Sequence, residues 1–135
     1  MKKYLFSVLF FVIVIINMAY SQEAKDLPRL YWGMYHSDID NDYLNKTSIT
    51  RWAKAAVPFR IITTENAKEQ TVFNITIEIA KPKSVKKTYK NEGNTISEEM
   101  KQALLNVASG DMVLITAYFA QAGKQANKQL IFAVE

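Results

Sequence analysis

The chain contains no cysteine, and its 135 residues include a single histidine, His36. Without cysteine the chain forms no disulfide bond and offers no thiolate to a metal ion or a substrate. A serine nucleophile normally needs a positioned base beside it, and His36 stands alone at the start of a polar segment. We therefore expect no enzymatic activity and no cofactor.

The acidic segment Asp38-Ile39-Asp40-Asn41-Asp42 resembles the start of a calcium-binding loop. An EF-hand loop requires glycine at its sixth position and glutamate at its twelfth. Counting from Asp38, these positions hold Tyr43 and Ile49. The segment is therefore interpreted as a solvated acidic loop with no metal site, and weak calcium binding is the alternative.

Long hydrophobic runs are also missing, except for one near the N-terminus. Lys2 and Lys3 precede an apolar run from Tyr4 to Ile16, which only Ser7 interrupts. Ala19-Tyr20-Ser21 then places small residues where a signal peptidase cleaves. This order predicts a signal peptide over residues 1–21 and hence a periplasmic or secreted protein.

A retained membrane anchor is the alternative interpretation of the same segment. A membrane-spanning helix needs about 20 apolar residues, and the run from Tyr4 to Ile16 is shorter. No cysteine follows the run, so a lipoprotein anchor is excluded. We expect contact with a membrane only if the N-terminal segment is retained.

The remaining residues, 22–135, have the length of one domain, 135 − 21 = 114 residues. A domain of this size buries a core without disulfide bonds. Removal of Lys2 and Lys3 leaves 15 of the 17 basic residues against 13 acidic ones, so the net charge falls from +4 to +2. Such a small charge indicates no nucleic-acid partner.

Hydrophobic periodicity predicts a β-rich α+β domain with antiparallel, sandwich-like sheets and two short helices. The clearest strand is 71–80, because Phe73, Ile75, Ile77 and Ile79 alternate with polar residues. Further strands are expected over 29–35, 59–64, 84–90, 111–120 and 129–134.

The two helices are predicted from their apolar faces and their capping residues. The first is expected over 48–56, with Ser48 as its cap, and it ends before Pro58. The second begins after Thr95, which has capping-box spacing to Glu98, and Gly110 is placed to end it.

Two sets of surface candidates remain. Tyr31, Trp32 and Tyr35 are the candidate binding residues, since large aromatic side chains dominate interface hot spots. In a single strand, Tyr31 and Tyr35 would share one face and Trp32 the other. Large aromatic residues also fill small cores, so core packing is the alternative here and the favoured role for Trp52.

The second set comprises five lysines around Pro82: Lys81, Lys83, Lys86, Lys87 and Lys90. One interpretation is attraction to anionic lipid or polysaccharide surfaces. The other is an edge strand that lysine and proline protect from aggregation, which are the residues that edge strands use. The sequence favours the edge strand.

The last forty or so residues resemble the C-terminal domain of GldM, the periplasmic component of the gliding-motility and type IX secretion machinery. Gly93-Asn94-Thr95-Ile96-Ser97-Glu98-Glu99-Met100 opens a helix, and Gly110-Asp111 leads into the strand 112–119. Ala122-Gly123-Lys124 turns the chain into the apolar strand 130–134. Segments 28–33, 46–56 and 73–77 follow the family's order more loosely.

This resemblance implies a β-sandwich-like periplasmic domain that acts by contact with other proteins, and the family also forms homodimers. A motor role is not carried over, because the apolar run near the N-terminus has no acidic residue for proton coupling. The expected function is an exported, non-catalytic protein-interaction domain whose partner is an envelope or outer-membrane protein. The alternative is an exported inhibitor or immunity-type protein that blocks a secreted enzyme.

Overall fold

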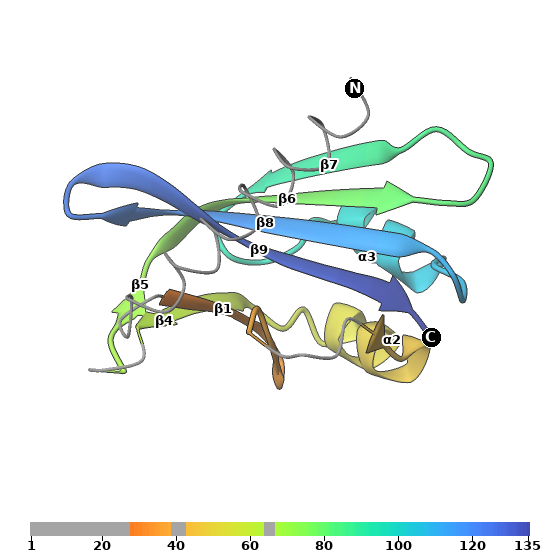
Figure 1. The fold of residues 1–135 in the computed structure, drawn as a ribbon, viewed down its shortest axis with the longest axis horizontal. Helices are drawn as coiled ribbons and strands as arrows, with labels where there is room; N and C mark the ends of the chain where they lie inside the picture. Colours follow the sequence, from red (N-terminus) through yellow and green to blue (C-terminus); the bar gives the residue numbers. More distant parts are fainter. Residues whose placement is uncertain (1–27, 39–42, 64–66) are drawn as a thin grey trace, which may run out of the picture.

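The structure is a computed structural model that describes residues 28–38, 43–63 and 67–135. The predicted signal peptide, Asp40 and Asp42 lie outside these residues. The described part contains two β-sheets and two helices, which confirms a β-rich α+β fold with a sandwich-like arrangement (Figure 1). The helices are α2 (Lys46–Lys54) and α3 (Glu98–Leu105).

The larger sheet has five strands in the order β3-β9-β8-β6-β7. These are β3 (Tyr43–Leu44), β9 (Lys124–Val134), β8 (Met112–Gln121), β6 (Val72–Ala80) and β7 (Lys87–Glu92). The smaller sheet has four strands in the order β2-β1-β4-β5, namely β2 (Tyr35–His36), β1 (Pro28–Trp32), β4 (Phe59–Thr63) and β5 (Glu69–Gln70). The strand pairs are antiparallel, as predicted, except that β3 runs parallel to β9.

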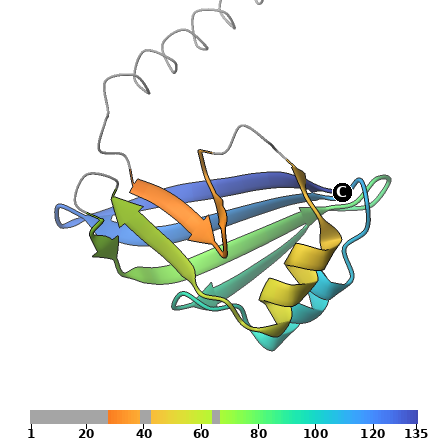
Figure 2. The same ribbon diagram turned by 90° about the horizontal axis from the view of Figure 1, so that it is seen from below.

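The smaller sheet and the two helices lie side by side over the same face of the larger sheet (Figures 1 and 2). The residues buried between these layers form one continuous apolar core, with Leu30 and Ile61 from the smaller sheet, Ile77 and Ile115 from the larger sheet and Met100 from α3. Among the described elements, none covers the opposite face of the larger sheet (Figure 1). We call this the open face.

The segment predicted as one strand over 29–35 is a hairpin, so that prediction is wrong. β1 ends at Trp32, and Gly33 and Met34 form the turn into β2. Gly33 has φ +60 and Met34 does not have positive φ, which matches the hairpin turns that take glycine at the first central position. Trp32 therefore pairs with Tyr35 on the core face, and Tyr31 pairs with His36 on the outer face.

The predicted strand over 71–80 is confirmed as β6, with one correction at Phe73. The register against β8 shifts between Val72 and Asn74, so Phe73 is the extra residue of a β-bulge. Val72 takes the core position and is 5% exposed, whereas Phe73 is 38% exposed. The alternation of Ile75, Ile77 and Ile79 into the core is as predicted.

Both helices form, but different residues cap them. The side chain of Asn45 accepts a hydrogen bond from the Ser48 N–H at 2.7 Å, so α2 begins one turn earlier than expected. The side chain of Ser97 caps α3 by accepting from the Met100 N–H at 3.2 Å. In each helix the cap is the polar residue directly before the first turn, Asn45 or Ser97, whose backbone is extended. The predicted caps, Ser48 and Thr95, do not have this role.

The predicted role of Gly110 at the end of α3 is also wrong. The helix ends at Leu105 with Asn106 as its C-cap. Gly110 has φ +93 and lies in the later turn that leads to β8, where its N–H donates to the Val134 carbonyl at 2.9 Å. Its left-handed backbone therefore serves the turn into the sheet.

Candidate functional site

Two of the three predicted binding aromatics lie in the core. Trp32 is 0% exposed and Tyr35 is 7% exposed. The Trp32 ring stacks on Phe59 with centroids 5.4 Å apart and meets the edge of Trp52 at 5.4 Å. Of the three residues, only Tyr31 is partly exposed on the outer face of the smaller sheet, with its ring 5.4 Å from His36.

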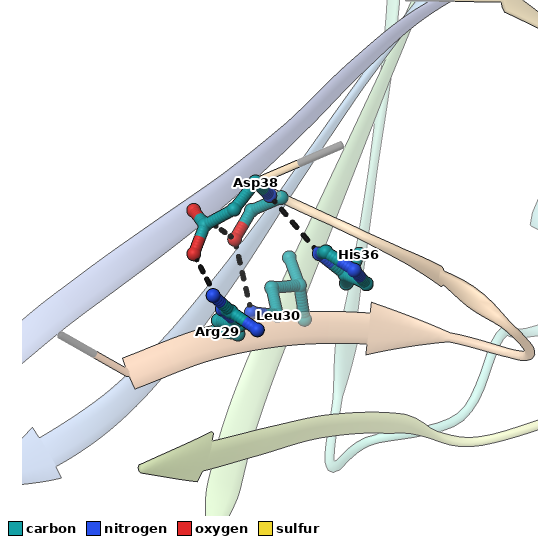
Figure 3. Close-up of polar contacts among 5 residues, drawn as sticks. Arg29, Leu30, His36 and Asp38 are labelled. Atoms are coloured by element: carbon teal, nitrogen blue, oxygen red, sulfur yellow. Dashed lines mark hydrogen bonds and ion pairs between the residues drawn. The ribbon is translucent and has the colours of Figure 1, made fainter. Parts of the chain in front are cut away.

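A small polar network surrounds this hairpin (Figure 3). Arg29 Nε donates to Asp38 Oδ2 at 2.6 Å, and the Leu30 N–H donates to Ser37 Oγ at 3.3 Å. The Asp38 N–H donates to His36 Nδ1 at 3.2 Å. A neutral His36 that accepts at Nδ1 carries its proton on Nε2.

His36, Ser37 and Asp38 are the residue types of a hydrolytic triad, but they are not arranged as one. Ser37 Oγ donates to Asp38 Oδ1 at 3.5 Å, and His36 Nδ1 is engaged by backbone. A triad needs the hydroxyl bonded to the imidazole and the imidazole bonded to the carboxylate. The contacts instead tie β1 to the chain that follows β2, and we assign no catalytic step to them.

Ion pairs occupy the outer face of the smaller sheet. The pKa of Arg29 is raised, chiefly by its hydrogen bond to Asp38 and to a smaller extent by a hydrogen bond with Tyr31. Arg60 binds Glu69 through two hydrogen bonds of 3.1 and 3.0 Å, which raise the pKa of Arg60 and lower the pKa of Glu69. These pairs are well exposed, so they contribute little to stability.

The open face of the larger sheet is different, because part of it is apolar. Strand register places Ala80, Met112, Ala133 and Tyr43 in one row across the sheet, and Leu114 and Ile131 in the next. Tyr43 is 57% exposed, Ile131 53% and Met112 43%. We call these six residues the apolar patch.

The rest of the open face is polar and hollowed. Asn74, Thr76, Tyr118, Lys90 and Glu92 line a hollow of about 520 Å³ in the direction of the β8–β9 hairpin tip. The open face is thus divided between the apolar patch at one end and a polar hollow at the other. This contrast makes the apolar patch the leading candidate contact surface.

Sequence reasoning missed the apolar patch, although a signal was present. The run Met112–Ala120 is apolar at almost every position, whereas a strand with one solvated face alternates. In a strand, every second residue faces outward. Apolar residues at the outward positions as well, such as Met112 and Leu114, indicate a strand with two apolar faces. Which end of the sheet stays uncovered depends on where β1, β4 and the helices pack.

A buried carboxylate, Asp111, joins the start of β8 to the loop after β6. Asp111 is 3% exposed and accepts hydrogen bonds from Lys81 Nζ and from the Ala108 N–H. Burial raises the pKa of Asp111, but the hydrogen bonds from Lys81 and Ala108, with the charges of Lys81 and Lys46, outweigh it. The pKa of Asp111 therefore lies below its usual value, and this carboxylate has a structural role.

The described residues contain no metal centre and no helix that could span a membrane. Residues 28–38, 43–63 and 67–135 hold no group of three or more His, Cys, Asp or Glu side chains placed to bind a metal ion. Across the same ranges, the helices are too short or too polar to cross a membrane. No protein-family model, no curated protein and no solved structure matches the chain.

Proposed function

We propose that the chain is an exported, non-catalytic protein-interaction domain of the cell envelope, resembling the GldM tail domain. It binds a partner protein through the apolar patch. The observation that carries this proposal is the exposure of Tyr43, Met112 and Ile131 together on one end of the open face.

The exposure of these side chains is unfavourable in water unless another surface covers them. A contiguous apolar group rimmed by polar residues is typical of protein contact sites. Tyrosine and methionine are also enriched in the desolvated centres of protein interfaces. Outside the apolar patch, the open face carries polar residues, among them Asn74, Thr76 and Thr88.

The test compares two substitutions on the same face of β9. Ile131→Lys places a charge in the apolar patch, and Asn127→Lys places the same charge four residues away, outside it. We expect Ile131→Lys to weaken capture of the partner from envelope extract by at least about tenfold, since an interface centre tolerates no unpaired charge. Asn127→Lys should leave capture unchanged.

Equal capture by both variants, or no protein partner with a monomer by light scattering, would contradict the proposal. A dimer that Ile131→Lys dissociates would identify a second copy as the partner. Capture of a secreted enzyme whose activity falls on binding would favour the inhibitor function instead.

A further inference from the structure

The loop that joins β6 to β7, residues 81–86, carries three of the five clustered lysines. We call it the lysine loop. β7 is an edge strand of the larger sheet. Lys90 lies within it, where edge protection accounts for a lysine, and Lys87 is its first residue, directly after the loop. Lys81, Lys83 and Lys86 lie outside the strand, and edge protection does not explain them.

The backbone of the lysine loop holds Lys83 in a conformation that favours glycine. The Ser84 N–H donates to the Lys81 carbonyl at 3.2 Å, which closes a turn with Pro82 at its second position. Lys83, at the third position, has φ +60. Lys83 is therefore exposed at the corner of a tight turn.

Ion pairs fix the two ends of the lysine loop. Lys81 binds Asp111 and also donates to the Asn106 carbonyl at 3.3 Å, while Lys86 binds Glu78 at 3.1 Å. Among the described residues, no carboxylate forms an ion pair with Lys83 or Lys87. Two ammonium groups are therefore left available to an external anion.

An exposed aliphatic residue, Val85, lies between these two lysines in the sequence. Val85 is 88% exposed, the highest value among the large apolar residues described. Beneath it, Ile79, Tyr89 and Ala103 line part of a hollow of about 250 Å³ between the lysine loop and α3. This volume is below the range of about 300–1,000 Å³ that encloses a small organic ligand.

We propose that the lysine loop docks the protein onto an anionic lipid surface. Lys83 in the loop and Lys87, the first residue of β7, contact headgroup phosphates, and Val85 enters the acyl boundary. A lipid surface is the occupant because it presents negative charge and an apolar layer together. A soluble polyanion would pair with the lysines but would offer nothing to Val85.

The experiment measures binding of the exported protein to vesicles of phosphatidylglycerol and phosphatidylethanolamine, with phosphatidylcholine vesicles as the neutral comparison. Mass spectrometry first establishes whether residues 1–21 are present, and all variants are compared in the same form. We expect Lys83→Gly and Lys87→Gln each to weaken binding about fivefold. Val85→Ser should weaken it up to about tenfold without changing the charge.

Two controls separate docking from folding and from general charge. Lys83→Gly relieves the positive φ, so thermal stability should not fall and misfolding cannot explain its weaker binding. Lys124→Gln removes a lysine at the start of β9, outside the lysine loop, and should leave vesicle binding unchanged.

Three outcomes would overturn the proposal. The first is equal binding to anionic and phosphatidylcholine vesicles. The second is unchanged binding in Lys83→Gly and Lys87→Gln. The third is binding to soluble dextran sulfate as tight as to vesicles and insensitive to Val85→Ser, which would assign the lysine loop to a polyanion instead.

Discussion

Gly33 lies at the tightest point of the β1–β2 hairpin. A Cβ atom on Gly33 would lie 2.3 Å from Cε2 of Trp52, and its φ is +60. Trp52 in turn packs against Trp32 in the core, so the ring has little room to move. The glycine therefore serves both the turn and the packing of an indole ring from α2.

We expect Gly33→Ala to lower the free energy of unfolding by about 3 kcal/mol, because overpacking adds to the backbone strain. Gly123→Ala is the matched control, since Gly123 has φ +74 but nothing within 4 Å of the added methyl group. The control should cost only about 1 kcal/mol. Urea unfolding of the two variants makes the comparison, and equal losses would show that the Trp52 contact is unimportant.

Asp111 makes the free energy of unfolding depend on pH in the acidic range. Because its pKa is lowered in the folded state, its contribution is fully present above the unfolded pKa of about 3.9. That contribution is lost as the pH falls through the lower folded pKa. Asp111→Asn should therefore be about 2 kcal/mol less stable than the wild type at neutral pH, through loss of charge-assisted hydrogen bonds.

Urea unfolding at several pH values measures this difference. The gap between wild type and Asp111→Asn should stay constant from pH 7 to about pH 5 and narrow below about pH 4. A gap that stays unchanged down to pH 2 would mean that the carboxylate charge contributes nothing.

At the scale of the elements, the two helix caps differ between the structure and the sequence-based prediction, and substitutions can tell them apart. Asn45→Ala should cost about 1 kcal/mol, because its side chain accepts the Ser48 N–H. Ser48→Ala should cost little, since Ser48 contributes only its backbone to that bond. For α3 the same comparison holds between Ser97→Ala and Thr95→Ala. Thermal unfolding of the four variants tests the order, and a larger loss in Ser48→Ala would return the cap to the residue that sequence spacing favours.

Elements with a strong period were predictable from the sequence, and their ends were not. Alternation along Ile75, Ile77 and Ile79 predicts β6, but the bulge at Phe73 depends on how β8 pairs with it. The turn at Gly33 was missed because the aromatic residues on both sides suggest one continuous strand. β3 has only two residues and pairs in parallel with the distant β9, so no local pattern predicts it.

For the candidate surfaces too, the sequence indicated the residue types but not which side chains the fold leaves exposed. Trp32 and Tyr35 were predicted as binding residues because they are aromatic, and the hairpin places both of them in the core. The apolar patch could not be predicted, because β8 is apolar on both faces and only packing decides which face is covered. The lysine cluster was visible in the sequence, but its division between loop and strand was not.

At the scale of the whole molecule, the two described sheets share one core. Phe132 of β9 lies with its ring 6.4 Å from Trp32 and 5.7 Å from Tyr35 across the layers. We expect Phe132→Ala to lower the free energy of unfolding by about 4 kcal/mol. Wild type and variant should each unfold in one transition that tryptophan fluorescence and far-UV circular dichroism report at the same midpoint. Separate midpoints would mean that the two sheets unfold independently.

The parallel pair of β3 and β9 has a consequence for the order of folding. Leu44 pairs with Val134, which lies 134 − 44 = 90 residues away, whereas β8 and β9 join through a short turn. Closing so long a loop costs more entropy than forming a hairpin, and contacts of this range form late. Tyr43 therefore takes its place beside Ala133 in a late step, and the apolar patch is complete only in the finished molecule.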